Sequence, residues 1–381
     1  MKKKIWLMCS YVLVAALATM ITLGLVGRSY APTKLEQLEG LIGECFIGEA
    51  DPEALEDAAA SAMVSATGDR WSYYIPASAY ETYQEQMENA YVGVGITIQA
   101  QEDDSGFLIL SVTPGGPAEE AGLKVNDLLI LVDDQDVRGM DTEDVRNLVK
   151  GEQGTSVSMT VLRVGDSITL PVERRKVETA VATYQMLEGN VGLVTIRNFD
   201  GRCASETIAA IEGLLEQGAE KFLFDVRNNP GGYAEELIKV LDYLLPEGEV
   251  FHTVTYDGQE DIDYSDAKCL EKPMAVLVNG SSYSAAEFFA AALQENEAAV
   301  VVGEKTVGKG YFQTTFRLSD GSAVSLSIGK YFTPKGENLA GVGVTPDRIV
   351  AVDEETAAGI YYGTVKPEED PQIQAALKVL Q

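Results

Sequence analysis

The spacing of hydrophobic and polar positions divides this chain into segments with different expected structures. Residues 1–30 contain a long apolar run, and residues 31–90 show helical periodicity. Over residues 91–175 the pattern changes to short strands separated by turns rich in glycine and proline. Over residues 176–350 apolar strands alternate with helices, which indicates an α/β domain, and residues 351–381 form a tail with helical character.

These patterns predict individual elements, and together they predict a multidomain α/β chain. In the N-terminal segment we expect helices at 33–46, 52–67 and 77–89. In the β-rich segment we expect strands at 92–99, 106–112, 128–132, 156–163 and 167–172, with a helix at 141–150. In the α/β segment we expect strands at 191–196, 221–227, 274–278 and 299–302, helices at 204–216, 234–245 and 285–295, and a β-hairpin at 312–318 and 323–328.

The N-terminal apolar run has the length of a membrane span. Residues 5–26 carry no charge, and at about 1.5 Å per residue they extend about 33 Å, enough to cross a bilayer. Lys2, Lys3 and Lys4 precede the run and only Arg28 follows it closely, so the N-terminus is expected in the cytoplasm and the rest outside. A cleaved signal peptide is the alternative. Because no small-x-small cleavage site precedes Ala31, an uncleaved anchor is favoured.

Charge and cysteine content narrow the classes of partner and cofactor. The formal net charge is −30, from 59 acidic and 29 basic residues, which argues against nucleic acid as a partner. The cysteines are Cys9, Cys45, Cys203 and Cys269, with no CxxC pair that would suggest a metal site. Cys9 lies in the apolar run. The other three permit at most one disulfide, and we expect three buried thiols instead.

One constellation of polar residues points to nucleophilic catalysis. Ser284 begins an alanine-rich helix, Lys309 follows 25 residues later between two glycines, and Gln313 follows after four more. A lysine that is kept neutral by desolvation can remove the proton of a serine, and a third group can orient it. The only histidine, His252, leaves a histidine-based triad open but offers it no second candidate. The sequence therefore favours Ser/Lys chemistry.

Each of these residues also has an ordinary structural interpretation. Ser284 and Glu287 satisfy the S-x-x-E pattern of a capping box, so Ser284 could simply cap the helix that starts at Ala285. Lys309 could be a surface lysine in a turn, and Gln313 a solvent-facing strand residue. The chemistry would use the same placement, however, because a helix start presents backbone N–H groups to a developing oxyanion, with Ala285 as the first donor.

Several motifs taken together resemble the carboxyl-terminal processing peptidases, the tail-specific serine proteases of family S41. The motifs are Asp-x-Arg-Asn-Asn-Pro-Gly-Gly at 225–232, Val-Asn-Gly-Ser-Ser-x-Ser-Ala-Ala-Glu at 278–287, Gly-Glu-Lys-Thr-x-Gly-Lys-Gly-x-x-Gln at 303–313, Tyr-Phe-Thr-Pro at 331–334 and Gly-Val-Thr-Pro-Asp at 343–347. The stretches 91–96 and 117–127 are similar to the PDZ domain of that family. The resemblance covers nearly all of the chain after the apolar run.

The resemblance implies a role for each site residue. It places the nucleophile at Ser284, the general base at Lys309 and the orienting glutamine at Gln313. It implies an oxyanion hole formed by the amides of Ala285 and a loop glycine, Gly232 in preference to Gly231. It also implies a crotonase-like α/β core, no metal or organic cofactor, and a homodimer. The chain departs from the family pattern at Tyr283, Val307, Tyr311 and Phe312, which puts substrate preference in doubt more than activity.

The PDZ-like segment has a candidate binding site for a peptide tail. Gly93 and Gly95 allow a loop whose successive N–H groups can hold a terminal carboxylate, while the following strand pairs with an extended peptide. The side chains of Val94 and Ile96 are expected to line the pocket for the last residue of the peptide. The alternative is a pair of structural glycines in a hairpin.

The resulting prediction is a membrane-anchored serine endopeptidase that recognises C-terminal tails and cleaves envelope proteins or peptides through an acyl-enzyme. The expected substrates have free C-termini, and the expected location is the outer face of a bacterial cell membrane. One alternative is a catalytically silent adaptor that uses only the PDZ-like domain. Another is an acyl-transfer enzyme or amidase that acts on a non-peptide substrate with the same Ser284 and Lys309.

Overall fold

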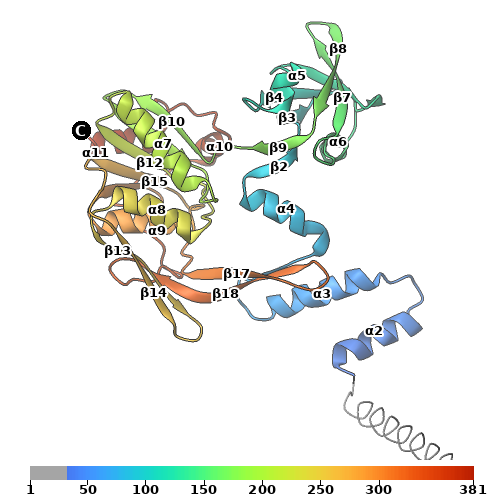
Figure 1. The fold of residues 1–381 in the computed structure, drawn as a ribbon, viewed down its shortest axis with the longest axis horizontal. Coiled ribbons are helices and arrows are strands. Elements are labelled where there is room, and N and C mark those ends of the chain that lie inside the picture. The colour runs from blue at the N-terminus through green and yellow to red at the C-terminus, as the bar shows by residue number, and fades with distance from the viewer. Residues whose placement is uncertain (1–31) are drawn as a thin grey trace, which may run out of the picture. The chain divides into compact units, whose positions relative to one another are not determined.

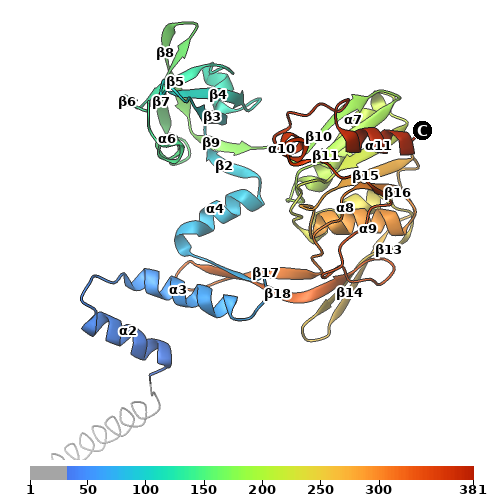
Figure 2. The ribbon, with the colours of Figure 1, turned by 180° about the vertical axis from the view of Figure 1, so that it is seen from behind.

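A computed structural model describes residues 32–381, and the predicted anchor at 5–26 lies outside the described residues. The chain forms two compact units, one ending at Tyr74 and one spanning Ile75–Gln381 (Figures 1 and 2). No helix within residues 32–381 is long and apolar enough to cross a membrane. The third predicted N-terminal helix, α4 (Ala77–Met87), falls in the larger unit.

The smaller unit contains two helices, α2 (Lys34–Cys45) and α3 (Pro52–Ser65), and β1 (Tyr73–Ile75) begins at its end. Both helices start at side-chain caps that the sequence shows: Thr33 with Glu36 forms a capping box, and Asp51 accepts a hydrogen bond from the amide of Glu53. Their bounds agree with the predicted helices to within two residues. Neither helix buries any of its own residues.

The β-rich segment forms a sheet attached through a two-stranded ribbon. The ribbon pairs β2 (Ala90–Gly93) with β9 (Arg175–Glu178), so the chain enters and leaves the module along adjacent strands. The module contains β3 (Ile96–Ala100), β4 (Phe107–Val112), α5 (Pro117–Ala121), β5 (Leu128–Val132), β6 (Gln135–Asp136), α6 (Thr142–Val149), β7 (Ser156–Arg163) and β8 (Asp166–Glu173). The sheet order is β3-β4-β5-β7-β8, with β6 on β5.

The single strand predicted at 92–99 is wrong, because the chain turns between β2 and β3. Gly95 has a φ of +81°, a left-handed conformation that interrupts an extended strand and that glycine adopts at little cost. The two halves therefore belong to different sheets, β2 to the ribbon and β3 to the module.

The α/β segment is built on a mainly parallel sheet in the order β10-β11-β12-β15-β16-β19. Its strands are β10 (Ala182–Leu187), β11 (Val191–Ile196), β12 (Lys221–Asp225), β15 (Met274–Val278), β16 (Ala299–Gly303) and β19 (Arg348–Ile349), of which only β10 is antiparallel to its neighbour. One face packs against α7 (Cys203–Glu216), α8 (Ala234–Leu244) and α9 (Ala285–Glu295), and the other against α11 (Pro371–Val379). In the chain, α10 (Glu354–Tyr362) lies between β19 and α11.

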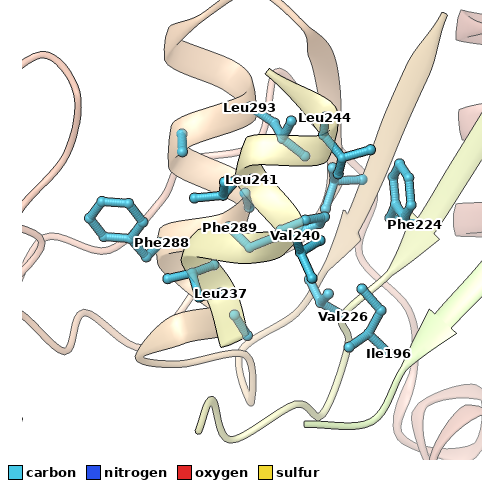
Figure 3. Packing of buried hydrophobic residues seen from close by; sticks show 14 of the residues in the cluster. Ile196, Phe224, Val226, Leu237, Val240, Leu241, Leu244, Phe288, Phe289 and Leu293 are labelled. Carbon is cyan, nitrogen blue, oxygen red and sulfur yellow. The ribbon is translucent and has the colours of Figure 1, made fainter. Parts of the chain in front are cut away.

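The central strands of this sheet are mainly apolar because both faces of the sheet are buried. All five residues of β15 are buried, and alternate residues of β12 and β15 contribute to the cores on opposite faces of the sheet. Figure 3 shows Leu237, Val240, Leu241 and Leu244 of α8 among side chains of α9 and of the sheet, including Phe289 and Phe224. The helix that carries Ser284 at its start is thereby fixed, since nine of its eleven residues are buried.

A second sheet contains the hairpin of β17 (Tyr311–Arg317) and β18 (Ala323–Phe332), and β13 (Gly248–Thr255) pairs β18 and β14 (Glu260–Ser265). The hairpin was predicted, but β18 continues past the expected end at 328 to Phe332. β13 and β14 were not predicted. The sequence of β14, EDIDYS, is acidic and has low strand propensity, so its pairing with β13 outweighs local preference.

Cysteine burial differs in part from the expectation. Cys203 is buried in α7, and burial raises the pKa of its thiol. Cys269 is partly buried, and Cys45 is exposed at the end of α2, so the expectation of three buried thiols is wrong for Cys45. All three are free thiols, and Cys9 lies outside the described residues.

Candidate active site

The loops that carry the site meet because two parallel strands end together. Asp225 in β12 pairs with Leu277 in β15, so the loops after these strands leave the same edge of the sheet. The Ser282 hydroxyl donates to the carbonyl of Val226 at 2.7 Å, which joins the two loops. The glycine loop at 228–233 and the serine at 284 are therefore neighbours although about fifty positions separate them.

Ser284 has an unusual backbone conformation at the start of α9. Its φ is +58° and its ψ is −125°, a region that residues other than glycine rarely occupy. Its backbone N–H donates to Oε2 of Glu287 at 3.1 Å, so the Glu287 half of the predicted capping box is present. The serine is thus held in a strained, partly exposed position at a helix start, where a nucleophile has backbone amides beside it.

The carboxylate of Glu287 brings Ser284 and Lys309 together. Oε2 accepts hydrogen bonds from the backbone N–H of Ser284 and from that of Lys309, the latter at 2.9 Å. Oε1 accepts from the Thr306 hydroxyl at 2.5 Å and from the Gly308 amide at 2.6 Å. Because the side chain of Glu287 is fully buried, it orders both loops at once. The sequence suggested only a capping role for this residue.

The two glycines around Lys309 are required by close packing. Gly308 has a φ of +84°, and a Cβ placed there would lie 3.1 Å from the amide of Gly343. A Cβ at Gly310 would lie 2.4 Å from the amide of Ala340. The backbone at both glycines therefore approaches its neighbours closely, and Lys309 between them is partly buried.

Tyr331 is a site residue whose role the sequence did not reveal. Its hydroxyl donates to the carbonyl of Lys309 and lies close to the side chain of Ser284. Burial, and secondarily the negative charge of Glu287, hold the pKa of Tyr331 well above its usual range, so the phenol stays neutral. The only signal in the sequence was its place in the motif at 331–334.

Gln313 lies on β17, where its amide group is fixed by two hydrogen bonds. Nε2 donates to the carbonyl of Tyr311 at 3.1 Å and to the hydroxyl of Ser327 at 2.9 Å. Lys309 precedes the first residue of β17, Tyr311, so strand alternation does not place its side chain on the face of Gln313. The orienting role of Gln313 stays a prediction.

Two backbone amides are available for an oxyanion. The amide of Gly231 donates to Oδ1 of Asn229 at 2.8 Å, whereas those of Gly232 and Ala285 donate no hydrogen bond within residues 32–381. A Cβ at Gly231 would lie 2.7 Å from that of Ser284, so the glycine loop touches the serine. This geometry is consistent with choosing Gly232 over Gly231 as the loop donor.

His252 lies on the opposite face of its strand from the site. Its ring packs against Phe332, with centroids 5.4 Å apart, while the neighbouring Phe251 packs against Tyr331. Successive side chains of a strand point to opposite faces. Tyr331 contacts Ser284, so this alternation turns His252 away from the serine and disfavours a histidine triad.

The predicted tail-binding loop is ordered mainly by its carbonyl groups. The carbonyl of Val94 accepts from Ala118 and that of Gly95 from Thr113, both at 2.9 Å. In the described part of the chain, the amides of Val94 and Gly95 donate to no protein group. These N–H groups are available for a carboxylate.

The side chains of the same loop differ from one another. Val94 is only 2% exposed and packs in the core of the module, so its side chain does not reach a surface pocket. Ile96 is partly buried, and Gly93 lies in the ribbon strand β2. Tail binding by these residues stays a prediction.

Across residues 32–381, no cluster of His, Cys, Asp and Glu has the arrangement of a metal site.

Comparisons with known proteins agree with this geometry. The model of peptidase family S41 matches residues 190–350, and a PDZ domain model matches residues 108–163. The carboxy-terminal processing protease CtpA of Bacillus subtilis (strain 168) is 31% identical over 361 residues, which cover 91% of this chain and 77% of that protein. A carboxyl-terminal-processing protease of Synechocystis is 30% identical, covering 84% of this chain and 75% of that protein.

A solved structure supports the fold independently. The crystal structure of a putative S41 protease from Bacteroides fragilis covers 92% of this chain and 97% of its own, with a TM-score of 0.53 and 17% sequence identity. At that identity the likeness concerns the fold alone. The sequence relatives and the family model go further: the chain belongs to the carboxy-terminal processing serine proteases of peptidase family S41, and it carries a PDZ domain.

Proposed function

We propose that this protein is an endopeptidase in which Ser284 attacks the substrate and Lys309 removes its proton. The observation that carries the proposal is the carboxylate of Glu287, which binds the backbone amides of both residues through one oxygen. The unpaired amides of Gly232 and Ala285 beside the serine support it further. A general base, a nucleophile and an oxyanion site are thereby assembled from three separate loops.

The proposed reaction follows from these positions. The neutral amine of Lys309 takes the proton of the Ser284 hydroxyl as the oxygen attacks the peptide carbonyl. The amides of Gly232 and Ala285 stabilise the resulting oxyanion, and the leaving amine takes a proton from the lysine. Water then attacks the acyl-enzyme with Lys309 again as base, which releases the second peptide and regenerates the serine. Gln313 would orient the lysine amine.

We further propose that the PDZ domain selects substrates by their free C-termini. The unpaired amides of Val94 and Gly95 would donate hydrogen bonds to the terminal carboxylate, and the strand β3 would pair with the tail. The apolar run at 5–26 after three lysines supports an anchored enzyme facing away from the cytoplasm, with envelope proteins or peptides as substrates. Deleting residues 1–30 should move the protein from the membrane fraction to the soluble fraction.

Variants of the two reacting residues test the catalytic part. Ser284→Ala and Lys309→Ala should each abolish cleavage of a flexible peptide while circular dichroism and thermal unfolding stay unchanged. The double variant should be no worse than either single variant, because base and nucleophile act as a unit. His252→Ala should retain most activity. Substantial cleavage by either single variant, or an additional large loss in the double variant, contradicts the assignment.

The pH profile tests the role of lysine as base. Lys309 must be neutral to accept a proton, so kcat/KM should rise with pH through an ionisation well below the ordinary lysine pKa of about 10.4. Gln313→Ala should lower kcat more than it changes KM. A flat profile between about pH 6 and 9 contradicts a lysine that titrates in that range.

A further inference from the structure

The glycine loop beside Ser284 is positioned by the backbone of Phe199. The amide of Phe199 donates to the carbonyl of Gly231 at 2.8 Å, and its carbonyl accepts from the amide of Tyr233 at 2.6 Å. A Cβ at Gly232 would lie 2.2 Å from the same carbonyl oxygen. The two neighbours of Gly232 in the chain, Gly231 and Tyr233, are therefore both hydrogen-bonded to Phe199, and the amide of Gly232 itself points away from Phe199. Any movement of Phe199 moves the proposed oxyanion donor.

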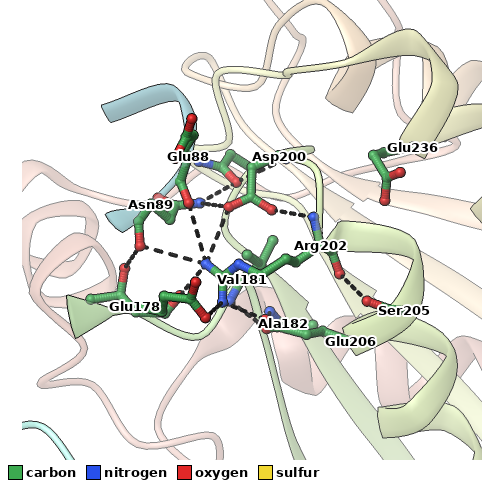
Figure 4. Close-up of polar contacts among 12 residues, drawn as sticks. Glu88, Asn89, Glu178, Val181, Ala182, Asp200, Arg202, Ser205, Glu206 and Glu236 are labelled. Carbon is green, nitrogen blue, oxygen red and sulfur yellow. Dashed lines mark hydrogen bonds and ion pairs between the residues drawn. The ribbon is translucent and has the colours of Figure 1, made fainter. Parts of the chain in front are cut away.

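The residues on both sides of Phe199 are held by the side chain of Asn89. Its Nδ2 donates to Oδ1 of Asn198 at 2.6 Å and to Oδ2 of Asp200 at 3.0 Å (Figure 4). Asn89 precedes β2, so it belongs to the ribbon that leads into the PDZ domain. It has a φ of +47°, a conformation that asparagine tolerates better than most residues.

Arg202 joins the same segment to both strands of the ribbon. Its Nη2 donates to the carbonyl of Thr179 at 3.0 Å and to that of Asn89 at 3.5 Å, and it lies 3.3 Å from Oδ2 of Asp200. The amide of Arg202 donates to Oδ1 of Asp200 at 2.8 Å. Because Asp200 is only 2% exposed, its carboxylate depends on these donors, and loss of one leaves a buried charge poorly compensated.

A second contact joins this cluster to the other end of the glycine loop. Glu236 lies in the first turn of α8, just after Tyr233, and its Oε2 accepts a hydrogen bond from the amide of Ala204 at 2.9 Å. Ala204 is in the first turn of α7, directly after Arg202 and Cys203. The segment at 198–204 is therefore bonded to the glycine loop and to the helix that follows it.

We infer that Asn89, Asp200 and Arg202 are positioning residues of the oxyanion hole. They touch no reacting atom; they fix Phe199, and Phe199 fixes the amide of Gly232. An oxyanion donor stabilises the transition state only where its direction is set beforehand, so a small displacement lowers kcat with little effect on substrate binding. The inference rests on the proposed function, because it assigns these residues to the oxyanion hole of Ser284.

Asn89→Asp tests the inference with an isosteric change. The carboxylate of the aspartate has no donor, so it would repel the side-chain oxygens of Asn198 and Asp200 that accept from Asn89. Aspartate still tolerates the left-handed backbone conformation of residue 89. Arg175→Ala is the matched control: Arg175 lies on the same ribbon, in β9, but its guanidinium pairs at 2.7 Å with Glu120 of α5 and not with residues 198–202. The measurements are kcat and KM on one peptide, and hydrogen exchange of the Tyr233 amide in the full-length protein.

In Asn89→Asp we expect kcat to fall about tenfold, less than the 100- to 1,000-fold typical of deleting an oxyanion donor, with KM changed less than about twofold. The Tyr233 amide should exchange faster by a similar factor, and the control should match the wild type in both measurements. If Asn89→Asp unfolds, Arg202→Lys replaces it, since lysine keeps the charge but cannot bond both strands.

The outcomes separate the inference from the proposed function. Unchanged kcat and unchanged Tyr233 exchange in a folded Asn89→Asp variant overturn the inference, provided that cleavage by the wild type is lost in Ser284→Ala. An equal fall of kcat in Arg175→Ala also overturns it, because the effect would then belong to the ribbon as a whole. Cleavage that persists in Ser284→Ala overturns the proposed function, and the inference with it.

Discussion

Two glycine-containing loops in this chain leave backbone amides free for an anion, and they are built in different ways. In the loop beside Ser284, Asn229 is fully buried, donates to the carbonyl of Ile196 at 2.8 Å and accepts from the amide of Gly231. In the PDZ loop, Val94 and Gly95 form hydrogen bonds with the rest of the described chain only through their carbonyl groups. One loop is fixed by buried side chains, and the other by backbone amides that lie just after β4 and in the first turn of α5.

Charged groups extend the contrast. At the base of the catalytic loop, the guanidinium of Arg227 is buried and pairs with Asp225 at 2.6 Å and with Asp370 at 2.8 Å. Burial by itself would lower the pKa of Arg227, but the two carboxylates outweigh it and raise that pKa, so the guanidinium keeps its charge. This ties the loop to the start of α11.

The difference matches what each loop would bind. An oxyanion exists only in the transition state and the intermediate, so its donors must be oriented before it forms. A terminal carboxylate is a stable ion on a peptide that also pairs along β3, so its loop can adjust during binding. Substitutions in the catalytic loop should therefore change kcat, and substitutions in the PDZ loop should change KM.

The largest effect is expected for Gly231→Ala. Its Cβ would lie 2.7 Å from Cβ of Ser284 and 2.8 Å from the amide of Ala285, so the serine or the loop must move. We expect kcat to fall about 100- to 1,000-fold, as for loss of an oxyanion donor. Gly218→Ala is the control, because Gly218 has the same φ of +91° with open space around it. A similar loss in the control would attribute the effect to backbone strain.

A smaller but still large effect is expected for Glu287→Gln. The carboxylate of Glu287 accepts hydrogen bonds from four donors. In glutamine one of its two oxygens becomes an NH2 group, which would face at least one of those donors without being able to accept from it. We expect kcat to fall by about tenfold to a hundredfold and the free energy of unfolding by about 2–4 kcal/mol. Steady-state kinetics and urea unfolding measure both. Unchanged kcat would show that Ser284 and Lys309 are placed by other contacts.

The PDZ loop should respond differently. A Cβ at Gly95 would lie 3.2 Å from that of Thr113, and its φ of +81° disfavours other residues. In Gly95→Ala we expect KM for a peptide with a free C-terminus to rise about fivefold with kcat unchanged, since the strain is about 1 kcal/mol. For the C-terminally amidated peptide, KM should be the same in the variant and in the wild type. Equal KM of the wild type for both peptides would end the tail-recognition proposal.

The sequence predicted what local patterns determine. β5, β7, β11, β15 and α9 have the expected bounds, because continuous apolar runs and cap residues are local signals. Ser284, Lys309 and Gln313 were predicted as site residues from residue type and spacing, and their roles stay predictions, whereas the family identified from motifs is confirmed.

The sequence could not show contacts that depend on the assembled sheet. The four hydrogen bonds of Glu287 and the contact of Tyr331 with Ser284 join loops far apart in the chain. The break at Gly95 and the strand β14 were missed because a turn inside an apolar run, or pairing by an acidic strand, is decided by tertiary partners. Asn89 and Arg202 carried no motif at all.

The smallest effect on catalysis is expected for a charge inside the PDZ domain. Asp127 is buried and accepts two hydrogen bonds from the guanidinium of Arg163, both at 2.7 Å, and one from the amide of Lys124 at 2.8 Å. Burial alone would raise the pKa of Asp127, but the bonds from Arg163 and Lys124 and the positive charge outweigh it and hold the pKa below its usual value of 3.8. A carboxyl whose folded pKa is lowered stabilises the fold above its unfolded pKa.

Asp127→Asn should therefore destabilise the PDZ domain by about 1–3 kcal/mol at neutral pH, and the difference from the wild type should vanish as the pH falls through the lowered pKa of Asp127. Asp136→Asn removes the same charge from an exposed pair with Arg138 in the same domain and should leave the unfolding midpoint unchanged. Thermal unfolding between pH 3 and 7 measures both. Because the catalytic loop has its own buried supports, kcat at neutral pH should not change in either variant. A fall of kcat in Asp127→Asn alone would show that the catalytic loop depends on the stability of the PDZ domain, and the contrast between the two loops would fail.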